Sequence, residues 1–354
     1  MTAPVGHERF LVTGAHGCIG AWVVRQLLAE HADVVALDVS DDAHRLRLLM
    51  TPDELAGLRS VRTDITDLDA VERTLDEHEI TNIIHLAALQ VPFCQADPAL
   101  GARVNVVGTI NMMEAAARRL ARMAPLVYAS SIAVYSELSP GQTAGGERAD
   151  AHQGVPGTLY GVYKRANEGA AVRYWQDRGL PSIGLRPHTV YGPGRDQGLT
   201  SAPTVAILAA VSGNRFEVSY GGRLQLQYAP DVARAFVQAS RSGAEAASVH
   251  NLKGQTVHMA DVVDAIEAAI PDAAGLISFK PAGLAFPQEV DSGSLTATIG
   301  NLKETPLASG IGDSVARFRA LLAADLLAPA GEQARDAAAH ASPAPSGIGP
   351  AQAD

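Results

Sequence analysis

The chain of 354 residues is poor in cysteine and has no long apolar run. Its two cysteines, Cys18 and Cys94, cannot build a disulfide framework, and neither lies in a CxxC or Cys/His cluster with zinc spacing. The eleven histidines are scattered and form no HExxH motif, so we expect no structural or catalytic metal. The longest apolar run, near residues 204–211, is far too short to span a bilayer, and we expect no membrane partner.

Positive charge is also scarce, because 28 Lys and Arg residues stand against 38 Asp and Glu residues. The formal net charge of −10 argues against a nucleic-acid partner, since phosphate backbones are bound by clustered Lys and Arg. Acidity of this size is ordinary for solubility. No basic segment followed by an apolar one precedes the first strand-like run, which favours a cytoplasmic protein without a signal peptide.

What the chain does have, from residue 9 to about 186, is an alternation of strand and helix patterns. Six short runs are typical of buried strands: Arg9–Thr13, Asp33–Asp38, Val61–Asp64, Asn82–Leu86, Leu126–Ala129 and Ser182–Arg186. Helical patterns separate them, the clearest being Ile19–Glu30, Asp67–Glu79, Leu100–Leu120 and Leu159–Arg178. Strands that alternate with helices pair in parallel through right-handed crossovers, so the sequence predicts an α/β fold with a Rossmann-type doubly wound sheet.

The pattern changes after residue 186, where Pro and Gly become frequent. A helix near residues 202–212, a strand near 224–228 and a helix from Asp231 follow. This region is too short and too interrupted to form an independent second sheet of any size. It therefore predicts a small cap packed against the open edge of the first domain.

These boundaries predict three parts of the chain. Residues 8–186 form the doubly wound domain, with return segments near 224–255, and residues 187–327 form mainly a small C-terminal substrate-binding cap. Residues 328–354 are rich in Ala, Pro, Gly and Ser. Such a tail cannot bury enough apolar surface to offset the entropy of ordering it, so we expect it to be disordered.

Three glycines follow the first predicted strand directly, in Thr13-Gly-Ala-His-Gly-Cys-Ile-Gly20. Glycines at this spacing allow a tight turn, close approach of a pyrophosphate and close helix–strand packing. The helix that begins here would add free N–H groups and the positive end of its dipole. The sequence thus predicts a dinucleotide site along the backbone of Gly14, Gly17, Cys18, Ile19 and Gly20.

Acidic and small residues end the next predicted strands at the carboxyl edge, where ligands bind in open α/β sheets. The carboxylate of Asp38 can accept both ribose hydroxyls and would repel a 2′-phosphate, which favours NAD over NADP. Arg45 and Arg47 are close enough in sequence to weaken that preference. The other candidates at this edge, which could equally serve strand-to-helix packing, are Asp64, Ile65, Leu86, Ala87 and Ala88.

Tyr160 and Lys164 lie four residues apart in a helical pattern, so both side chains share one face of the helix. A tyrosine ordinarily has a pKa near 10, and its use as a base near neutral pH needs about 4 kcal/mol of charge stabilisation. The ammonium of Lys164 and a positive nicotinamide would both favour the phenolate. Tyr163 would point elsewhere on the helix, and we expect it to pack.

Ser130 and Ser131 follow the strand predicted at residues 126–129. A hydroxyl at this place can hydrogen-bond a substrate oxygen whose charge changes during hydride transfer. We expect Ser131 to be the catalytic hydroxyl and Ser130 to support substrate binding. Paired serines after a strand are also ordinary loop chemistry.

Taken in order, these features resemble the extended short-chain dehydrogenase/reductase family, the NAD-dependent epimerase/dehydratase group. The resemblance covers roughly residues 9–326 and implies an NAD-dependent enzyme with a small-molecule substrate, and it suggests a homodimer. It also implies that Asn105 supports the sheet next to the active site, and that the segment after Arg186 contacts nicotinamide through its backbone. We count Asn105, Tyr160 and Lys164 among the candidate cofactor-binding residues. The matched elements are the glycine loop, Asp38, Asp64-Ile65, His85-Leu-Ala-Ala88, Asn105 with Val106-Val107-Gly108, Ser131, Tyr160, Lys164, Arg186-Pro187 and Val190-Tyr-Gly-Pro193.

The sequence departs from the nucleotide-sugar members of that family beside the active site. Where dehydratases carry an Asp-Glu pair after the active-site hydroxyl, this chain has Ile132-Ala133, so a dehydratase is not expected. Gln90 stands where related epimerases often have a lysine. We therefore count Gln90 among the candidate substrate-binding residues.

Two further departures concern the diphosphate of a nucleotide sugar. His188 replaces an asparagine of the family, and the family's strand arginine would fall at Leu224. Arg223 lies one residue off, on the opposite face of a regular strand unless a bulge intervenes. A conventional UDP-sugar site is therefore not expected, and Arg195, Arg223 and His188 are candidates to hold a smaller anionic or polyhydroxylated substrate.

Three functions follow from these residues. The first is an NAD-dependent oxidoreductase that acts at a secondary alcohol or ketone carbon of a sugar, sugar acid or similar molecule. The second is a nucleotide-sugar epimerase that keeps its NAD and returns the hydride to the opposite face. The third is a non-catalytic NAD(H)-sensing protein, although such proteins usually lose the tyrosine or lysine that this chain retains.

Overall fold

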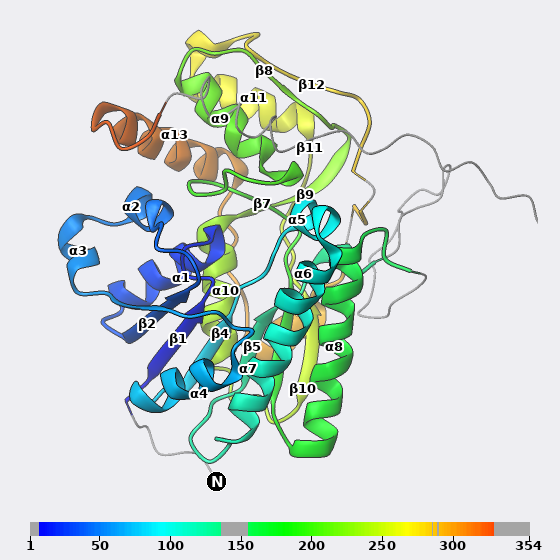
Figure 1. Cartoon of the computed structure of the whole chain (residues 1–354). Helices are drawn as coiled ribbons and strands as arrows, with labels where there is room; N and C mark the ends of the chain where they lie inside the picture. The colour runs from blue at the N-terminus through cyan, green and yellow to red at the C-terminus, as the bar shows by residue number, and fades with distance from the viewer. Residues whose placement is uncertain (1–6, 136–154, 285, 289, 329–354) are drawn as a thin grey trace, which may run out of the picture.

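The computed structural model describes residues 7–135, 155–284, 286–288 and 290–328. Its larger part is a parallel sheet with helices on both faces, and a smaller part with its own strands lies across the carboxyl ends of that sheet (Figure 1). The predicted α/β class with a Rossmann-type sheet and a small C-terminal cap is confirmed. The predicted disordered tail lies outside the described residues, except for its first residue.

Seven parallel strands form the large sheet, in the order β10-β6-β5-β4-β1-β2-β3. They are β1 (Arg9–Thr13), β2 (Asp33–Asp38), β3 (Arg59–Arg62), β4 (Asn82–His85), β5 (Leu126–Ala129), β6 (Ser182–Arg186) and β10 (Ala247–Asn251). The edge strand β3 lies two residues earlier than predicted, because its exposed residues give little apolar pattern. The strand order reverses between β1 and β4, where ligands bind in folds of this kind.

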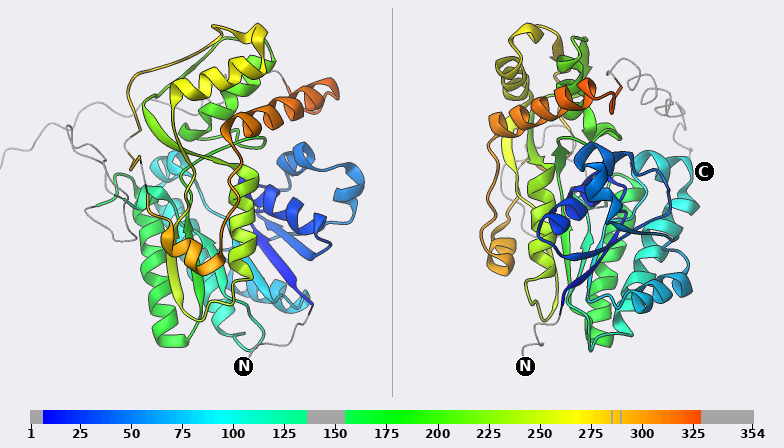
Figure 2. Two further views of the ribbon diagram at one scale, coloured as in Figure 1. Left: turned by 180° about the vertical axis from the view of Figure 1, so that it is seen from behind. Right: turned by 90° about the vertical axis from the view of Figure 1, so that its left-hand side faces the viewer.

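Helices cover both faces of this sheet because alternate strand residues point to opposite sides. In β1, Phe10 and Val12 belong to one apolar core and Leu11 to the other. The first core is covered by α1 (Cys18–Ala29) and α10 (Ala229–Ser240). The second is covered by α4 (Leu68–Glu77), α7 (Gly108–Ala117) and α8 (Leu159–Arg178). Figure 2 shows the sheet between these two layers.

The helix expected over residues 100–120 is interrupted. The chain forms α6 (Pro98–Ala102), one π-helical turn (Arg103–Val107) and α7. π-helical turns interrupt helices mostly at functional sites. Three short helices complete this part of the fold, α2 (His44–Leu49), α3 (Pro52–Ala56) and α5 (Val91–Ala96).

The cap contains a three-stranded sheet and a strand pair. The sheet is formed by β7 (Thr189–Tyr191), β9 (Arg223–Tyr228) and β11 (Gln255–His258), and the pair by β8 (Phe216–Val218) and β12 (Ile277–Phe279). Their apolar core lies against α9 (Ala202–Val211), α11 (Met259–Ala269) and α13 (Leu307–Ala323). Of the return segments, α10 and β10 join the large domain, as does the later helix α12 (Gly293–Ile299), whereas β9 stays in the cap.

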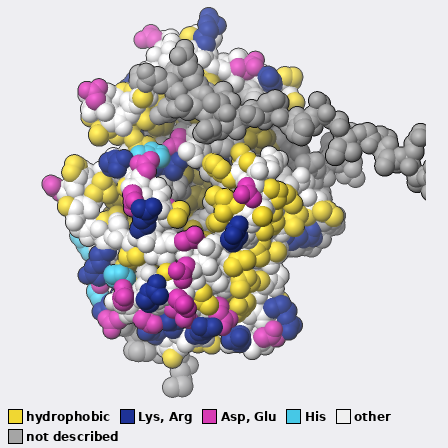
Figure 3. Space-filling model, viewed as in Figure 1, with side chains coloured by type: hydrophobic (Ala, Val, Ile, Leu, Met, Phe, Trp, Pro, Cys, Tyr) yellow, Lys and Arg dark blue, Asp and Glu magenta, His cyan; other side chains and the backbone are white. Residues whose placement is uncertain are grey.

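The surface carries an apolar patch over α5, α6, α7 and α8, visible on the right of Figure 3. Large exposed apolar side chains of these helices and of the π-helical turn include Phe93, Leu100, Val107, Val162 and Val172. Among the described residues, every helix is too short or too polar to cross a membrane.

Candidate active site

The three predicted catalytic residues meet at the start of α8. Ser131 follows β5, and its side chain hydrogen-bonds the Tyr160 hydroxyl. The Lys164 ammonium lies 5.6 Å from the centre of the Tyr160 ring, one helical turn away. Thr158 caps the helix by accepting a hydrogen bond from the Gly161 backbone at 3.1 Å. The spacing in sequence and the cap together fix Tyr160 and Lys164 beside Ser131.

The charge that supports Tyr160 differs from the one expected. Burial raises the pKa of Tyr160, while the Ser131 hydrogen bond and the Arg195 charge oppose that rise. The Lys164 ammonium instead donates to the Ala129 carbonyl at 2.6 Å, and burial lowers the pKa of Lys164 to about 8. In the protein alone, Arg195 therefore acts on the tyrosine as the predicted lysine was expected to.

A buried ion pair holds α8 against the sheet. Glu168 accepts two hydrogen bonds of 2.8 Å from Arg186, whose side chain is 1% exposed. Ser130 also donates to Glu168, so its hydroxyl faces this pair and not a substrate. The prediction of Ser130 as a substrate residue was therefore wrong, because the residue after β5 alternates into the core. Nothing in the sequence indicated that Glu168 and Arg186 form an ion pair, since the two residues are 18 positions apart.

A second buried network lies under the catalytic helix. The Asn105 amide accepts from the Leu89 N–H at 2.7 Å and donates to the Leu89 carbonyl at 2.9 Å. Its own carbonyl accepts from Asn167 of α8 at 2.8 Å. Asn105 is fully buried, so it positions the segment after β4 and does not itself touch a cofactor. This corrects the prediction that Asn105 is a binding residue and agrees with the support role that the resemblance implied.

His85 joins this network to the first strand. Its Nδ1 lies 2.7 Å from the Thr13 hydroxyl and its Nε2 lies 3.0 Å from the Thr109 hydroxyl. Burial, helped by the Lys164 charge, lowers the pKa of His85 to about 3, so the ring is neutral near pH 7. The histidine is a positioning residue that links β1, β4 and α7.

The predicted glycine loop leads into a helix whose first backbone donors have no side-chain cap. Gly17 begins α1 without a side-chain cap, and the loop closes through a 2.9 Å hydrogen bond from the Gly17 N–H to the Gly14 carbonyl. Gly14 has φ +66°, and a Cβ there would lie 2.6 Å from the Ala87 nitrogen. Only glycine lets the two strand ends approach this closely. These uncapped N–H groups at Cys18, Ile19 and Gly20 suit a pyrophosphate.

The ribose side of this site lies at the end of β2. The Asp38 carboxylate accepts from the His16 N–H at 3.0 Å, so it lies against the glycine loop. Both nearby arginines have acidic partners: Arg45 pairs with Asp196 at 2.7 Å and Arg47 with Asp42 at 3.1 Å. These ion pairs reduce the ability of either arginine to hold a 2′-phosphate. The donor set therefore fits a dinucleotide with free ribose hydroxyls.

The remaining predicted cofactor residues lie at the same sheet edge. Asp64 is exposed and accepts from Thr66, while Ile65 is buried and packs against Gly108. Leu86, Ala87 and Ala88 follow β4 as half-buried residues, and the N–H groups of the first two face the Thr13 hydroxyl.

The structure keeps two of the predicted substrate residues near the catalytic tyrosine. Arg195 follows β7, and its Nη2 donates to the Thr200 hydroxyl at 2.8 Å. The Gln90 amide lies beside the same loop, because a Cβ on Gly198 would meet its Oε1 at 2.6 Å and the Arg195 Nη2 at 3.7 Å. Arg195 and Gln90 thus both lie beside Gly198.

The other two substrate candidates are placed differently. His188 is buried, with Nε2 donating to the Pro287 carbonyl at 2.8 Å and Nδ1 accepting from the Thr189 N–H at 2.9 Å, so the prediction of a substrate role was wrong. Burial lowers its pKa to about 4. Arg223 is exposed at the start of β9, opposite His258, while Leu224 is buried in the cap core. The register of β9 is regular, so no bulge moves an arginine inward.

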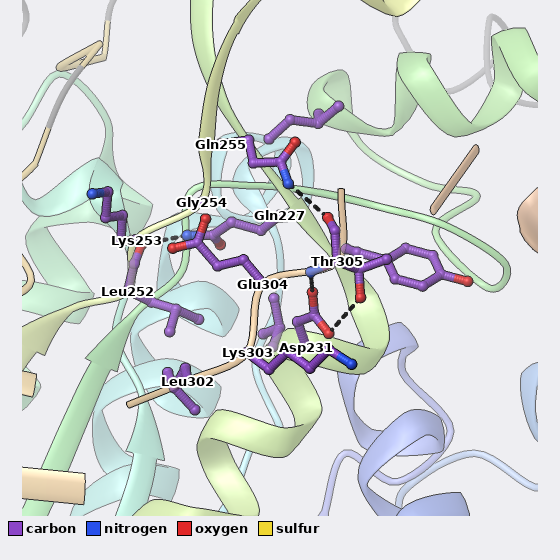
Figure 4. Close-up of a pocket in the computed structure, with 13 residues that line it drawn as sticks. Gln227, Asp231, Leu252, Lys253, Gly254, Gln255, Leu302, Lys303, Glu304 and Thr305 are labelled. Carbon is purple, nitrogen blue, oxygen red and sulfur yellow. Dashed lines mark hydrogen bonds between the residues drawn. The ribbon is translucent and has the colours of Figure 1, made fainter. Parts of the chain in front are cut away.

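A small cavity of about 30 Å³ lies elsewhere, between β9, the start of α10 and the segment before α13 (Figure 4). Asp231 closes it by accepting hydrogen bonds from the Thr305 N–H and hydroxyl at 2.7 and 3.0 Å. Gln255 donates to the Thr305 carbonyl. None of the three catalytic residues lines it, and its size suits a water molecule, so we assign the substrate site from the catalytic residues instead.

Comparison with known sequences supports an enzyme of one family. The model of the NAD dependent epimerase/dehydratase family matches residues 10–252. An uncharacterized 37.6 kDa protein of Escherichia coli O111:H- is 28% identical over 88% of this chain and 98% of its own length. The UDP-glucose 4-epimerase of Mycolicibacterium smegmatis is 33% identical over 65% of this chain and 72% of its own. The UDP-glucuronate 4-epimerase 2 of Arabidopsis thaliana is 32% identical over 52% of this chain, but the match spans only 42% of the plant protein.

Solved structures share the fold over nearly the whole of their chains. The UDP-glucose 4-epimerase of Thermus thermophilus in complex with NAD is 26% identical, with a TM-score of 0.72 over 88% of this chain and 99% of that one. An L-threonine dehydrogenase of Clostridium difficile has a TM-score of 0.75 over 89% of this chain and 98% of that one, but at 20% identity it shows the fold alone. Because the family model covers most of the chain, this protein belongs to the NAD-dependent epimerase/dehydratase family of enzymes.

Proposed function

We propose that the protein is an NAD-dependent oxidoreductase acting at a secondary alcohol or ketone carbon of a sugar, sugar acid or similar hydroxylated small molecule. The observation that carries this proposal is the meeting of Ser131, Tyr160 and Lys164 at one end of α8. A proton acceptor, a hydrogen-bond donor to the reacting oxygen and a buried cation are the groups such a reaction needs.

The residues that would hold NAD lie along one edge of the sheet. The backbone N–H groups of Cys18, Ile19 and Gly20 would bind the pyrophosphate, and Asp38 would accept the ribose hydroxyls. Bound NAD supplies the acceptor for a hydride from the carbinol carbon. The acidic partners of Arg45 and Arg47 support NAD over NADP.

The protein groups move the other proton of the reaction. Tyr160 as phenolate takes the proton of the substrate hydroxyl, while Ser131 donates a hydrogen bond to the same oxygen. Lys164, anchored on the Ala129 carbonyl, retains two further N–H donors for the cofactor ribose and for passing the proton onward. A bound nicotinamide adds positive charge that lowers the tyrosine pKa further.

A second candidate is a nucleotide-sugar epimerase, favoured by the relatives named as UDP-glucose 4-epimerases. The same residues would remove and return the hydride without net reduction of NAD. Two residues argue against an epimerase of this kind. Leu224 is an apolar side chain buried in the cap core, and the His188 ring is already hydrogen-bonded to the Pro287 carbonyl. Neither residue can hold a diphosphate as the family's arginine and asparagine would.

The test is to incubate the purified protein with NAD and a panel of sugars, aldonates, uronates and UDP-sugars, following NADH and product stereochemistry together. A dehydrogenase forms stoichiometric NADH, and an epimerase inverts a centre without net NADH. Tyr160→Phe should lower activity at least about 100-fold. Tyr163→Phe is the matched control, because that hydroxyl only donates to the Pro98 carbonyl at the surface. NAD binding without turnover of any compound would instead support a sensing protein.

A further inference from the structure

The loop after β7 carries a cation without an anionic partner beside the catalytic tyrosine. Arg195 makes one side-chain hydrogen bond, from Nη2 to Thr200, and within the described residues its buried Nε has no acceptor. The next residue, Asp196, cannot neutralise it, because that carboxylate accepts from both Arg45 and His44. A buried guanidinium nitrogen without an acceptor is costly unless a ligand supplies one.

A second unpaired polar group lies on the cap side of this loop. The Tyr220 hydroxyl, between β8 and β9, is buried and has no hydrogen-bond partner within the described part of the chain. The positive charge of Arg195 opposes the rise that burial causes in the pKa of Tyr220 and in the pKa of Tyr160, so it acts on the cap tyrosine and on the catalytic hydroxyl alike. The Gln90 amide closes the same space beside Gly198.

We infer that Arg195, with Tyr220 and Gln90, binds a carboxylate of the substrate, so that the enzyme acts on hydroxy acids such as aldonates or uronates. This inference rests on the proposed function and names its substrate class. In the reaction the carbinol C–H bond breaks, its hydride reduces NAD to NADH, and the hydroxyl proton passes to Tyr160. The carboxylate is unchanged and serves only to bind and orient the carbon.

A carboxylate fits this place better than the diphosphate of a nucleotide sugar. One guanidinium can bind one carboxylate through two parallel hydrogen bonds, and neutral Tyr220 and Gln90 can donate to its remaining lone pairs. A diphosphate carries more charge, yet the family position for its arginine is occupied by buried Leu224. The pyrophosphate of the cofactor is the other anion within reach, since the Arg195 charge also acts on Cys18 at the start of α1.

The experiment compares matched acid and neutral compounds on the full-length protein with NAD. The pairs are D-gluconate with D-glucitol, D-galactonate with galactitol, and D-glucuronate with D-glucose, with UDP-glucuronate and UDP-glucose as the nucleotide-linked pair. NADH formation gives kcat/KM for each compound, and thermal shifts of the NAD-loaded protein report binding. We expect the acid of at least one pair to exceed its neutral partner by at least about 100-fold in kcat/KM.

Variants of Arg195 then assign the effect. Arg195→Gln should lower kcat/KM for the acid about 100-fold more than for its neutral partner, which loses only the charge that supports Tyr160, and should leave the KM for NAD nearly unchanged. Arg195→Lys should recover part of the loss, because it keeps the charge without the two-pronged geometry. Arg215→Gln, at an exposed arginine elsewhere in the cap, is the matched control and should behave as wild type.

Several results would overturn the inference. Equal use of acid and neutral partners by the wild-type protein would do so without any variant. A rise in the KM for NAD with equal loss for all substrates would assign Arg195 to the cofactor pyrophosphate instead. NADH from neutral alcohols alone would refute the carboxylate site and leave the proposed function standing, whereas neither turnover nor binding of any compound would refute both.

Discussion

Two arginines near the candidate active site, Arg186 and Arg195, differ in whether the protein supplies a carboxylate partner. On the sheet side, Arg186 is buried and meets Glu168 through two hydrogen bonds. On the cap side, Arg195 has no carboxylate partner among the described residues. A buried charge needs a partner, and the protein supplies it for Arg186. Arg195 is half-buried with an unpartnered Nε, and we infer that a ligand supplies its acceptor. The first arrangement holds α8 in place, and the second selects what binds above it.

The largest expected effect is the loss of stability when the buried ion pair on the sheet side is broken. Glu168→Ala leaves the buried guanidinium of Arg186 without the carboxylate that balances its charge, and should lower the free energy of unfolding by about 3–5 kcal/mol. Urea titration followed by circular dichroism measures this. Asp177→Ala is the control on the same helix, because its pair with Arg173 is exposed and should contribute less than about 1 kcal/mol. Equal losses in the two variants would show that burial does not distinguish the pairs.

The pH dependence of stability tests whether the pKa of the buried Lys164 is lowered. Burial holds the pKa of Lys164 to about 8 in the folded chain, below the ordinary value of 10.5. At a pH between these two pKa values, Lys164 is protonated in the unfolded chain but not in the folded chain. This residue therefore makes the free energy of unfolding rise with pH. The free energy of unfolding of wild type minus that of Lys164→Met should therefore increase between about pH 7.5 and about pH 9.5. A difference that stays constant or changes in the opposite direction would contradict the lowered pKa.

A smaller effect is expected at the nucleotide end of the site. Asp38→Asn removes the charge that repels a 2′-phosphate, and should lower the preference for NAD over NADP about tenfold, or about 1.4 kcal/mol. Asp41→Asn is the control, since that exposed carboxylate pairs with Arg62. Initial rates with each cofactor give the two values of kcat/KM. An unchanged ratio would mean that Asp38 does not face the ribose.

The smallest effect on the folded subunit is expected at the outer face of α8. Glu168 on the inner face of this helix is hydrogen-bonded to Arg186 of the sheet, whereas Val162 and Val172 are exposed. Figure 3 shows hydrophobic side chains gathered over α5, α6, α7 and α8. We propose that this patch forms the interface of the homodimer that the family resemblance suggests. Val172→Glu should convert a dimer to a monomer in light scattering, with unfolding changed by less than about 0.5 kcal/mol. Gln176→Glu is the charge-matched control, and a monomeric wild-type protein would refute the interface.

Local patterns predicted much of the large domain. The six strands and the helix of Leu159–Arg178 follow from apolar periodicity, because buried parallel strands and long helices repeat it clearly. The glycine loop, Ser131 and the Tyr160–Lys164 pair were also predictable, since each is a short motif. The seventh strand β10 was predicted only as part of a return segment, because its place depends on chain pairing across the domain.

Long-range contacts decided the rest of the candidate site. The partners of Glu168, His188 and Asn105 are set by segments that meet only after folding, and no spacing in the sequence announces them. For the same reason Ser130 and Ser131, adjacent in the chain, face a buried ion pair and the catalytic tyrosine respectively.

The sequence by itself determined the family of the protein and identified Tyr160 and the glycine loop as candidates for the reaction and for a dinucleotide, because these rest on residues close together in the chain. Only the tertiary structure decided which of the candidate cations has a partner. Asp196 follows Arg195 in sequence, but it forms its ion pair with Arg45, which lies 151 residues away. Asp196 is therefore not available to neutralise Arg195. Charge balance is a property of the folded arrangement, since an ion pair depends on distance in space and not on distance along the chain.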